Sequence, residues 1–141
     1  MFVLDTNVVS ELRKIRVGTA DPRVTAWADS VDAGSLYLSA ITILELEMGV
    51  LQLERKDPRQ GAVLRTWLDT LVLPEFNGRI LPIDTVVAQR CARLHVPNRR
   101  GERDALIAAT ALAHGMTFVT RNLADFEATG APLLNPWEYL Q

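Results

Sequence analysis

Four acidic side chains stand where elements of an alternating strand and helix pattern would begin or end. Asp5 and Asp125 each follow a short apolar run, and Glu45 and Asp104 each lie near the start of an apolar helical segment. Two carboxylates 4 Å apart repel by roughly 1 kcal/mol in water and about 4 kcal/mol at an effective dielectric of 20. A hard cation such as Mg²⁺ or Mn²⁺ turns that repulsion into binding, because it takes carboxylate oxygens and water as ligands. These residue types indicate metal-assisted hydrolysis, with a phosphodiester as the natural substrate.

Each of these acids also has a simpler explanation. Asp5 could only cap a helix, Asp104 could only favour the positive end of a helix dipole, and Asp125 could only start a turn. Glu45 could only close a capping box with Thr42 in the pattern T-x-x-E. Histidine and cysteine are absent from these segments, which disfavours zinc. The prediction of a site therefore depends on all four acids meeting at one place.

The composition fits a single cytoplasmic domain. The chain has 141 residues, 48% of them hydrophobic, and a formal net charge of -2. That charge argues against a general nucleic-acid coat, which needs a basic surface, although it permits a local basic rim. The single cysteine, Cys91, cannot form an internal disulfide, and we find no signal peptide and no apolar run long enough for a membrane span. We expect a cytoplasmic location and no contact with membranes.

Hydrophobic periodicity predicts five short strands separated by helices. The strands are expected at 2–4, 36–38, 78–82, 117–120 and 132–134. Helices are expected after Thr6 or Asn7 as N-cap, from Pro22 to Gly34, from Thr42 onward, and over 58–71, 85–94 and 102–114. With no two-residue hairpin turns between them, the strands should form a parallel sheet. The predicted fold class is α/β, with helices on both faces of the sheet.

Several other side chains are assigned to packing. Trp27, Trp67 and Met48 recur at helical core spacing. His95 and His114 have no plausible partner in the acidic segments, so both are placed at helix ends.

Four segments together resemble the four sequence blocks of the PIN-domain ribonucleases. They are Asp5-Thr6-Asn7, the run 38–46 that contains Glu45, the run 104–111 that starts at Asp104, and Val119-Thr120-Arg121-Asn122. The resemblance covers essentially the whole chain in order. It is greatest to the VapC-type toxins of toxin-antitoxin pairs, and within them to the FitB-like branch, which ends in a segment similar to Asn135-Pro136-Trp137.

The resemblance implies a fold and a set of site residues. It implies a single PIN domain over residues 1–141, a PIN-like sheet, and cleavage of RNA with Mg²⁺ or Mn²⁺. Asp5, Glu45 and Asp104 match the three acids of the family's metal site, with Asp5 and Asp104 as the metal ligands. The supporting polar positions that line the site match Thr6, Asn7 and Thr120.

One position departs from the pattern. Many relatives have a fourth acid directly after Thr-Arg, where this chain has Asn122. The next acid is Asp125, and we expect it to approach the site with Asn122 as a neutral hydrogen-bonding partner. A second metal is therefore in doubt.

The resemblance also implies partners. It implies a homodimer, a cognate antitoxin similar to VapB or FitA that inhibits the nuclease, and DNA contact only through that antitoxin. An alternative function is that of a subunit in a DNA-bound toxin-antitoxin regulatory complex with weak or no nuclease activity. A small-molecule phosphatase is a third possibility, against which the Asn at position 7 argues, because it removes an Asp-x-Asp nucleophile pair.

Basic side chains flank the predicted site on both sides and could bind RNA phosphates. The alternative is that they are solvated helix ends. They are Arg13, Lys14, Arg16, Arg99, Arg100 and Arg103.

Overall fold

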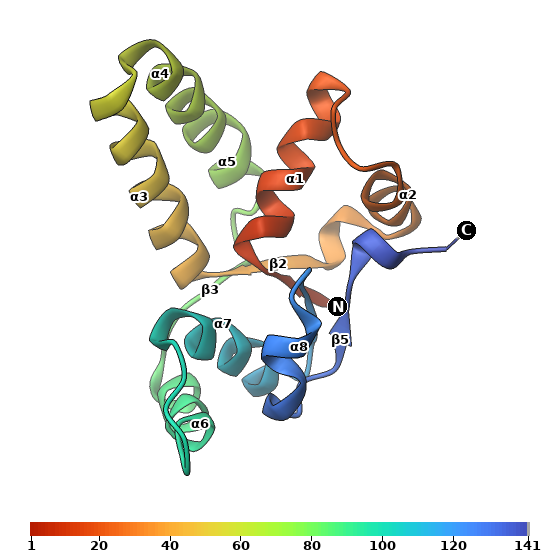
Figure 1. Ribbon diagram of the computed structural model, residues 1–141, viewed down its shortest axis with the longest axis vertical. Helices are drawn as coiled ribbons and strands as arrows, with labels where there is room; N and C mark the ends of the chain where they lie inside the picture. Colours follow the sequence, from red (N-terminus) through yellow and green to blue (C-terminus); the bar gives the residue numbers. More distant parts are fainter. Residues whose placement is uncertain (141) are drawn as a thin grey trace.

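A five-stranded parallel sheet forms the centre of the molecule (Figure 1). The computed structural model describes residues 1–140. The strand order is β3-β2-β1-β4-β5, and every neighbouring pair is parallel. The strands are β1 (Phe2–Leu4), β2 (Leu36–Ser39), β3 (Ile80–Leu81), β4 (Thr117–Val119) and β5 (Leu133–Leu134). The predicted α/β class and parallel sheet are confirmed.

Helices cover the sheet in two layers (Figure 1). The first layer contains α1 (Thr6–Val17), α2 (Pro22–Ser30), α3 (Ala40–Lys56), α4 (Pro58–Trp67) and α5 (Leu73–Glu75), with a π-helical turn over Leu68–Val72. The second contains α6 (Thr85–Leu94), α7 (Glu102–Ala113) and α8 (Leu123–Phe126). Short 3-10 turns occupy Ala33–Ser35, Glu127–Thr129 and Pro136–Glu138. Within residues 1–140, no helix has the length and apolar character that a bilayer span needs.

Alternation along the strands explains the two layers. Leu4 and Val119 point to one face and pack in a core with residues of α1, α2 and α3. Val3 and Phe118, which are their neighbours along the chain, point to the other face and pack with residues of α7 and α8. All four are fully buried, and burial of a side chain of this kind contributes about 1.5–3 kcal/mol. The register pairs Val3 with Phe118 and Leu4 with Val119, so the ends of β1 and β4 coincide.

The helix starts follow the predicted Asp-Pro and Asp signals. The carboxylate of Asp21 accepts from the backbone N–H of Arg23 at 2.8 Å, and Asp57 and Asp84 cap α4 and α6 in the same way. Each such cap is worth about 1 kcal/mol. Gly61 lets α4 approach α3 closely, because a Cβ there would lie 2.5 Å from the Cα of Glu54.

Several predicted boundaries and burials are wrong. Residue 5, not residue 6 or 7, is the N-cap of α1, and α2 ends at Ser30 well before Gly34. Met48 is 36% exposed, because its side chain lies on the outer surface of α3. Trp27 lies in the core and Trp67 packs against it while partly buried, so both are packing residues as predicted.

Candidate functional site

Asp5 and Thr120 lie side by side at the carboxyl edge of the sheet. Each follows its strand by one residue, and the register of β1 with β4 makes them neighbours. The backbone N–H of Asp5 donates to Val119 O at 2.8 Å, which extends the ladder to the site. The Thr120 hydroxyl then donates to Asp5 Oδ2 at 2.9 Å, and Oδ1 accepts from the N–H of Thr6 at 2.8 Å. Asp5 is therefore both a helix cap and the buried centre of a polar cluster.

Glu45 reaches the cluster from α3. Its Oε1 accepts from the Thr6 hydroxyl at 2.7 Å, and the same hydroxyl lies 3.3 Å from Thr42 Oγ1. The Nε of Arg103 lies 3.7 Å from Glu45 Oε2. These contacts place a carboxylate from the second turn of α3 next to the first residue of α1.

The capping box predicted for Thr42 and Glu45 is wrong. Ser39 caps α3 by accepting from the N–H of Ile41 at 3.1 Å, and Thr42 is fully buried inside the helix. Thr42 is thus a polar neighbour of the site that sequence reasoning missed. The available signal was its spacing of three residues from Glu45, which puts both on one helix face.

Asp104 and Asp125 approach from α7 and α8. They line a common cavity of about 220 Å³ together with Arg100 and Gly101. Both acids are exposed, and in the part of the chain that the structure describes no hydrogen bond or ion pair engages either carboxylate. Asp104 lies in the first turn of α7, as predicted.

The acids act on one another electrostatically. Burial raises the pKa of Asp5 above its usual range, the hydrogen bonds from Thr120 and Thr6 oppose this rise, and the charges of Asp104 and Glu45 add to it. Partial desolvation in its cavity also raises the pKa of Asp104, and the charges of Glu45 and Asp125 raise it further, whereas Arg103 lowers it. Four acids from separate segments therefore share one electrostatic environment, which favours protons or cations.

Two asparagines complete the set of predicted positions, and one of them contacts the cluster. The backbone N–H of Asn122 donates to Thr120 Oγ1 at 3.1 Å, so residue 122 supports the cluster through its main chain. Asn7 Oδ1 is buried and, within residues 1–140, has no hydrogen-bond partner. An unsatisfied buried acceptor costs about 1–3 kcal/mol, which a cation or a water molecule beside it would offset.

The donor set fits a hard divalent cation rather than a soft one. All candidate ligands are oxygens, and no three Asp, Glu, His or Cys side chains of residues 1–140 form a ready-made group of metal ligands. Mg²⁺ requires less than that, since it commonly binds one or two carboxylates and keeps several waters. Asp5 and Asp104 each supply a carboxylate of this kind, and Asn7 supplies an amide oxygen without a hydrogen-bond partner in the described residues.

Four of the six basic residues predicted to flank the site contact another side chain. Arg103 contacts Glu45, Lys14 pairs with Glu11 at 3.2 Å, and Arg99 pairs with Glu102 at 3.2 Å. Arg13 lies over the Trp67 ring, 5.8 Å from its centre. His95 and His114 are the C-caps of α6 and α7, so both lie at helix ends as predicted, and His95 Nδ1 accepts from the backbone N–H of Arg100 at 3.1 Å.

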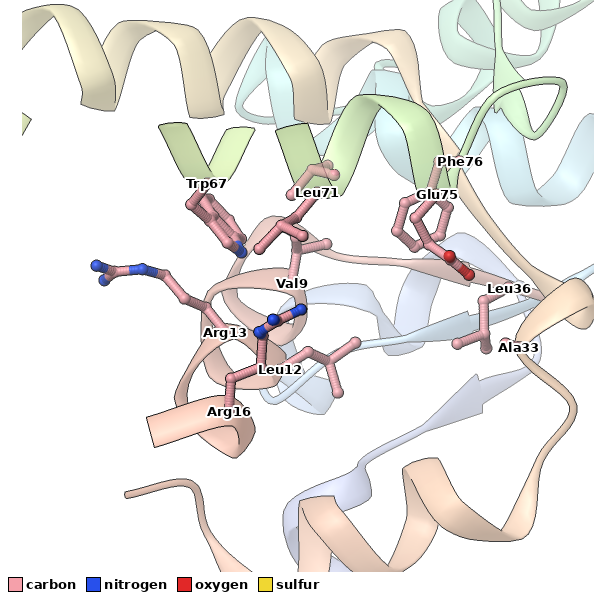
Figure 2. A pocket seen from close by; sticks show the side chains of 11 residues that line it. Val9, Leu12, Arg13, Arg16, Ala33, Leu36, Trp67, Leu71, Glu75 and Phe76 are labelled. Carbon is pink, nitrogen blue, oxygen red and sulfur yellow. The ribbon is translucent and has the colours of Figure 1, made fainter. Parts of the chain in front are cut away.

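A second, apolar cavity of about 320 Å³ lies between α1 and the segment from α4 to α5. Figure 2 shows Trp67, Leu71 and Phe76 on one side of it and Val9 and Leu12 on the other. Its rim carries Arg13, Arg16 and Glu75 (Figure 2). This cavity contains none of the four acids, so it is a separate surface.

Comparison with known proteins identifies the family. The PIN domain model matches residues 2–131. The chain is 41% identical over 143 residues to the VapC ribonuclease Y4jK of Sinorhizobium fredii, covering 98% of this chain and 99% of the relative. It is 39% identical to the toxin FitB of Neisseria gonorrhoeae, covering 97% and 99% of the two chains. The crystal structure of FitAcB from Neisseria gonorrhoeae superposes with a TM-score of 0.87 at 38% identity, covering 98% and 99%. The chain therefore belongs to the PIN-domain family.

Proposed function

We propose that this protein is a metal-dependent endoribonuclease that acts as the toxin of a toxin-antitoxin pair. The observation that carries the proposal is the convergence of acids from separate segments. Thr6 is hydrogen-bonded to both Asp5 and Glu45, and the charges of Asp104 and Glu45 add to the rise in the pKa of Asp5. The relatives named a VapC ribonuclease and a toxin match over nearly the whole chain, which supports the same activity.

Asp5 and Asp104 would hold Mg²⁺ or Mn²⁺ in this proposal. The bound ion supplies Lewis-acid stabilisation of the charge that develops on the phosphate oxygens. Thr120 and the N–H of Thr6 fix the Asp5 carboxylate in one orientation, because each oxygen of Asp5 accepts one of these bonds. Such supporting bonds typically change activity 10–100-fold when removed from ligands of this kind.

Glu45 and Asp125 would orient the attacking water. The Thr6 hydroxyl donates to Glu45 Oε1 and fixes the orientation of this carboxylate. The remaining lone pairs of Glu45 therefore have a defined direction. Asp125 supplies a second carboxylate in the cavity that Asp104 lines. A water held between such acceptors can lose a proton to one of them as its oxygen attacks phosphorus.

A titration of Mg²⁺ and Mn²⁺ tests this proposal. The purified, partner-free protein is incubated with a mixed RNA pool, with and without a chelator, beside the Asp5→Asn variant. Asn keeps an oxygen for the cap of α1 and removes the charge. We expect cleavage that needs the metal and that falls at least about 100-fold in the variant. Equal cleavage by both proteins would contradict the proposal.

One position motivates a test of an alternative function. Asn122 stands where many relatives have an acid, and a solved relative with 37% identity and a TM-score of 0.88 is described as FitAB bound to an IR36 DNA fragment. The alternative is a subunit of a DNA-bound regulatory complex with weak or no nuclease activity, although the relatives named ribonucleases favour the nuclease. Metal binding without cleavage of any RNA, followed by a gain of cleavage in Asn122→Asp, would favour this alternative. Turnover of a phosphomonoester would instead favour the phosphatase.

We further infer a cytoplasmic protein that forms a homodimer and binds a cognate antitoxin, with DNA contact through that antitoxin. The apolar cavity of Figure 2 supports a protein partner, because an amphipathic segment can bury its apolar face there and reach the Arg13 and Arg16 rim with acidic residues. Leu71→Glu would place a charge in that cavity. We expect it to abolish co-purification with the antitoxin and to leave RNA cleavage by the free protein unchanged.

A further inference from the structure

Arg100 differs from the other basic residues near the acids. Its Nε donates to Leu94 O at 3.0 Å, and its backbone N–H donates to His95 Nδ1 at 3.1 Å. The side chain is partly buried, and within residues 1–140 its guanidinium forms no ion pair with any carboxylate. Arg103 and Arg99, by contrast, each contact a glutamate. Arg100 is thus a positioned cation with two free terminal nitrogens.

The same residue joins two cavities. Arg100 lines the cavity of about 220 Å³ that contains Asp104 and Asp125. It also lines a neighbouring cavity of about 300 Å³, whose wall includes Arg93, Pro97 and Asn98. Arg100 is therefore part of the wall of both cavities, and the second cavity contains another arginine at the end of α6.

The start of α7 adds polar donors to this surface. Gly101 is the N-cap of α7 and supplies no side-chain acceptor to the first turn, so the N–H groups of residues 103 and 104 lack the usual capping partner. Gly101 lines the cavity with Arg100. Free N–H groups at the start of a helix of this length bind anions, and an adjacent guanidinium strengthens that preference.

Charge balance explains why the proposed reaction needs such a group. An RNA strand that approaches Asp104 and Asp125 meets two negative charges, and its own phosphates add more. The Arg103 charge is already engaged by Glu45. A free guanidinium in the same cavity offsets the repulsion and forms bidentate hydrogen bonds with a phosphate, which ammonium groups cannot do.

We propose that Arg100, with the N-terminus of α7, binds a backbone phosphate of the RNA strand that flanks the phosphate being cut. The strand then leaves the acidic site along the cavity wall toward Arg93. This inference rests on the proposed ribonuclease function and deepens it by assigning one exit path for the substrate. Arg100 is a binding residue here, because it contacts the flanking phosphate and not the reacting atoms.

The test measures binding of a labelled single-stranded RNA by anisotropy at several salt concentrations. Asp5→Asn serves as the background so that the strand stays intact. Each phosphate contact on a single strand contributes about 0.7 to the slope of log K against log salt. Removal of the guanidinium in Arg100→Ala should lower that slope by about 0.7 and weaken binding roughly 5–10-fold at moderate salt.

Two further variants separate a binding role from a structural one. Arg59→Ala makes the same charge change on α4, at a residue that lines neither cavity, and should keep the parent slope. Arg100→Lys keeps the charge and loses the Nε bond to Leu94 O. It should retain the slope if the charge binds phosphate, and should behave like Arg100→Ala if only that bond matters, which would overturn the proposal.

A third variant should raise the stability of the protein and weaken RNA binding. A Cβ at Gly101 would have only Asp104 Oδ2 within 4 Å, at 3.8 Å, so the backbone tolerates a side chain there. Gly101→Asp should cap α7, raise the Tm and weaken RNA binding, because its carboxylate takes the N–H groups and repels the phosphate. A higher Tm with unchanged RNA affinity would remove the helix N-terminus from the proposed site.

The outcomes distinguish the two proposals. If Arg100→Ala binds RNA with the parent slope while the protein with Asp5 intact cuts RNA, the assignment of Arg100 is wrong and the ribonuclease stands. If the protein neither binds nor cuts any RNA, both are wrong. A lower slope in Arg100→Ala alone supports both.

Discussion

The acidic site has two halves, which differ in how many hydrogen bonds the rest of the chain donates to their carboxylates. In the half formed by α1, β4 and α3, Asp5 and Glu45 accept short hydrogen bonds from Thr120 and Thr6. In the half formed by α7 and α8, Asp104 and Asp125 are exposed in a cavity and accept no hydrogen bond within residues 1–140. The fold thus fixes one half in advance and leaves the other to be satisfied by what binds there.

This difference indicates where a ligand acts. Preorganised groups cost no reorganisation when the reaction occurs, whereas unsatisfied charges favour binding of an opposite charge. A cation between Asp5 and Asp104 would join the halves. Variants on the two sides should therefore have different effects on stability, although both reduce activity.

Asp104→Asn should have the largest effect. It removes a charge from the unsatisfied half, so we expect RNA cleavage to fall at least about 100-fold while the Tm stays level or rises. Glu102→Gln is the matched control, because Glu102 lies in the same first turn and pairs with Arg99. Its cleavage should stay within about twofold of the parent. A large drop in Tm for Asp104→Asn would contradict the comparison.

Thr120→Val should damage the preorganised half. The variant keeps the shape of the side chain but loses the bond to Asp5 Oδ2 and the acceptor for the N–H of Asn122. We expect a loss of about 1–3 kcal/mol in the free energy of unfolding and a 10–100-fold loss of cleavage. Denaturant unfolding and single-turnover kinetics measure these, and Thr120→Ser should restore most of both.

Thr6→Val should have a smaller effect. It releases Glu45 Oε1, but Arg103 still approaches the other oxygen at 3.7 Å. We expect cleavage to fall roughly 10-fold and the free energy of unfolding to fall by about 0.5–1.5 kcal/mol. The Thr6→Val and Glu45→Gln changes together should cost little more than Glu45→Gln alone, since Thr6 acts through its contact with Glu45. Independent losses would show that Thr6 acts elsewhere.

The pH dependence should be the smallest effect and is measured on the metal-free protein. The pKa values of Asp5 and Asp104 are raised in the folded state, so between the unfolded and folded pKa the folded state binds more protons. The contribution of these two groups to stability is therefore greatest at low pH and is lost as pH rises through the folded pKa. The Tm advantage of Asp104→Asn over the parent should shrink as the pH falls from 7 toward 4. An advantage that grows on acidification would mean that the pKa of Asp104 is lowered on folding instead of raised.

The sequence predicted the strand-derived part of the site better than the helix-derived part. Asp5 and Thr120 meet because each directly follows a parallel strand, and strand ends can be read from short apolar runs. The Thr6–Glu45 contact depends on where α3 begins and how it packs on α1, which are properties of the whole fold. The pattern T-x-x-E suggested a cap at Thr42, but Ser39 forms it, because the helix begins directly after β2.

Hydrogen bonds between a side chain and a backbone group could not be predicted from the sequence either. His95 accepts from the N–H of Arg100, and Arg100 donates to Leu94 O. No sequence pattern predicts either contact, so the sequence does not distinguish the six basic residues near the site. The structure separates Arg100 from those that form ion pairs. The family resemblance, by contrast, was carried by blocks of sequence and is confirmed by the PIN domain match over residues 2–131.

The most direct test of the central claim is a double-variant cycle on Asp5 and Asp104. Single-turnover cleavage of one RNA is measured at saturating Mn²⁺ for the parent, Asp5→Asn, Asp104→Asn and the double variant. If both carboxylates serve one cation, either single change removes the shared function, and the double variant should be about as slow as the slower single one. Multiplicative losses in the double variant would show that the two acids act independently, and would contradict a shared site.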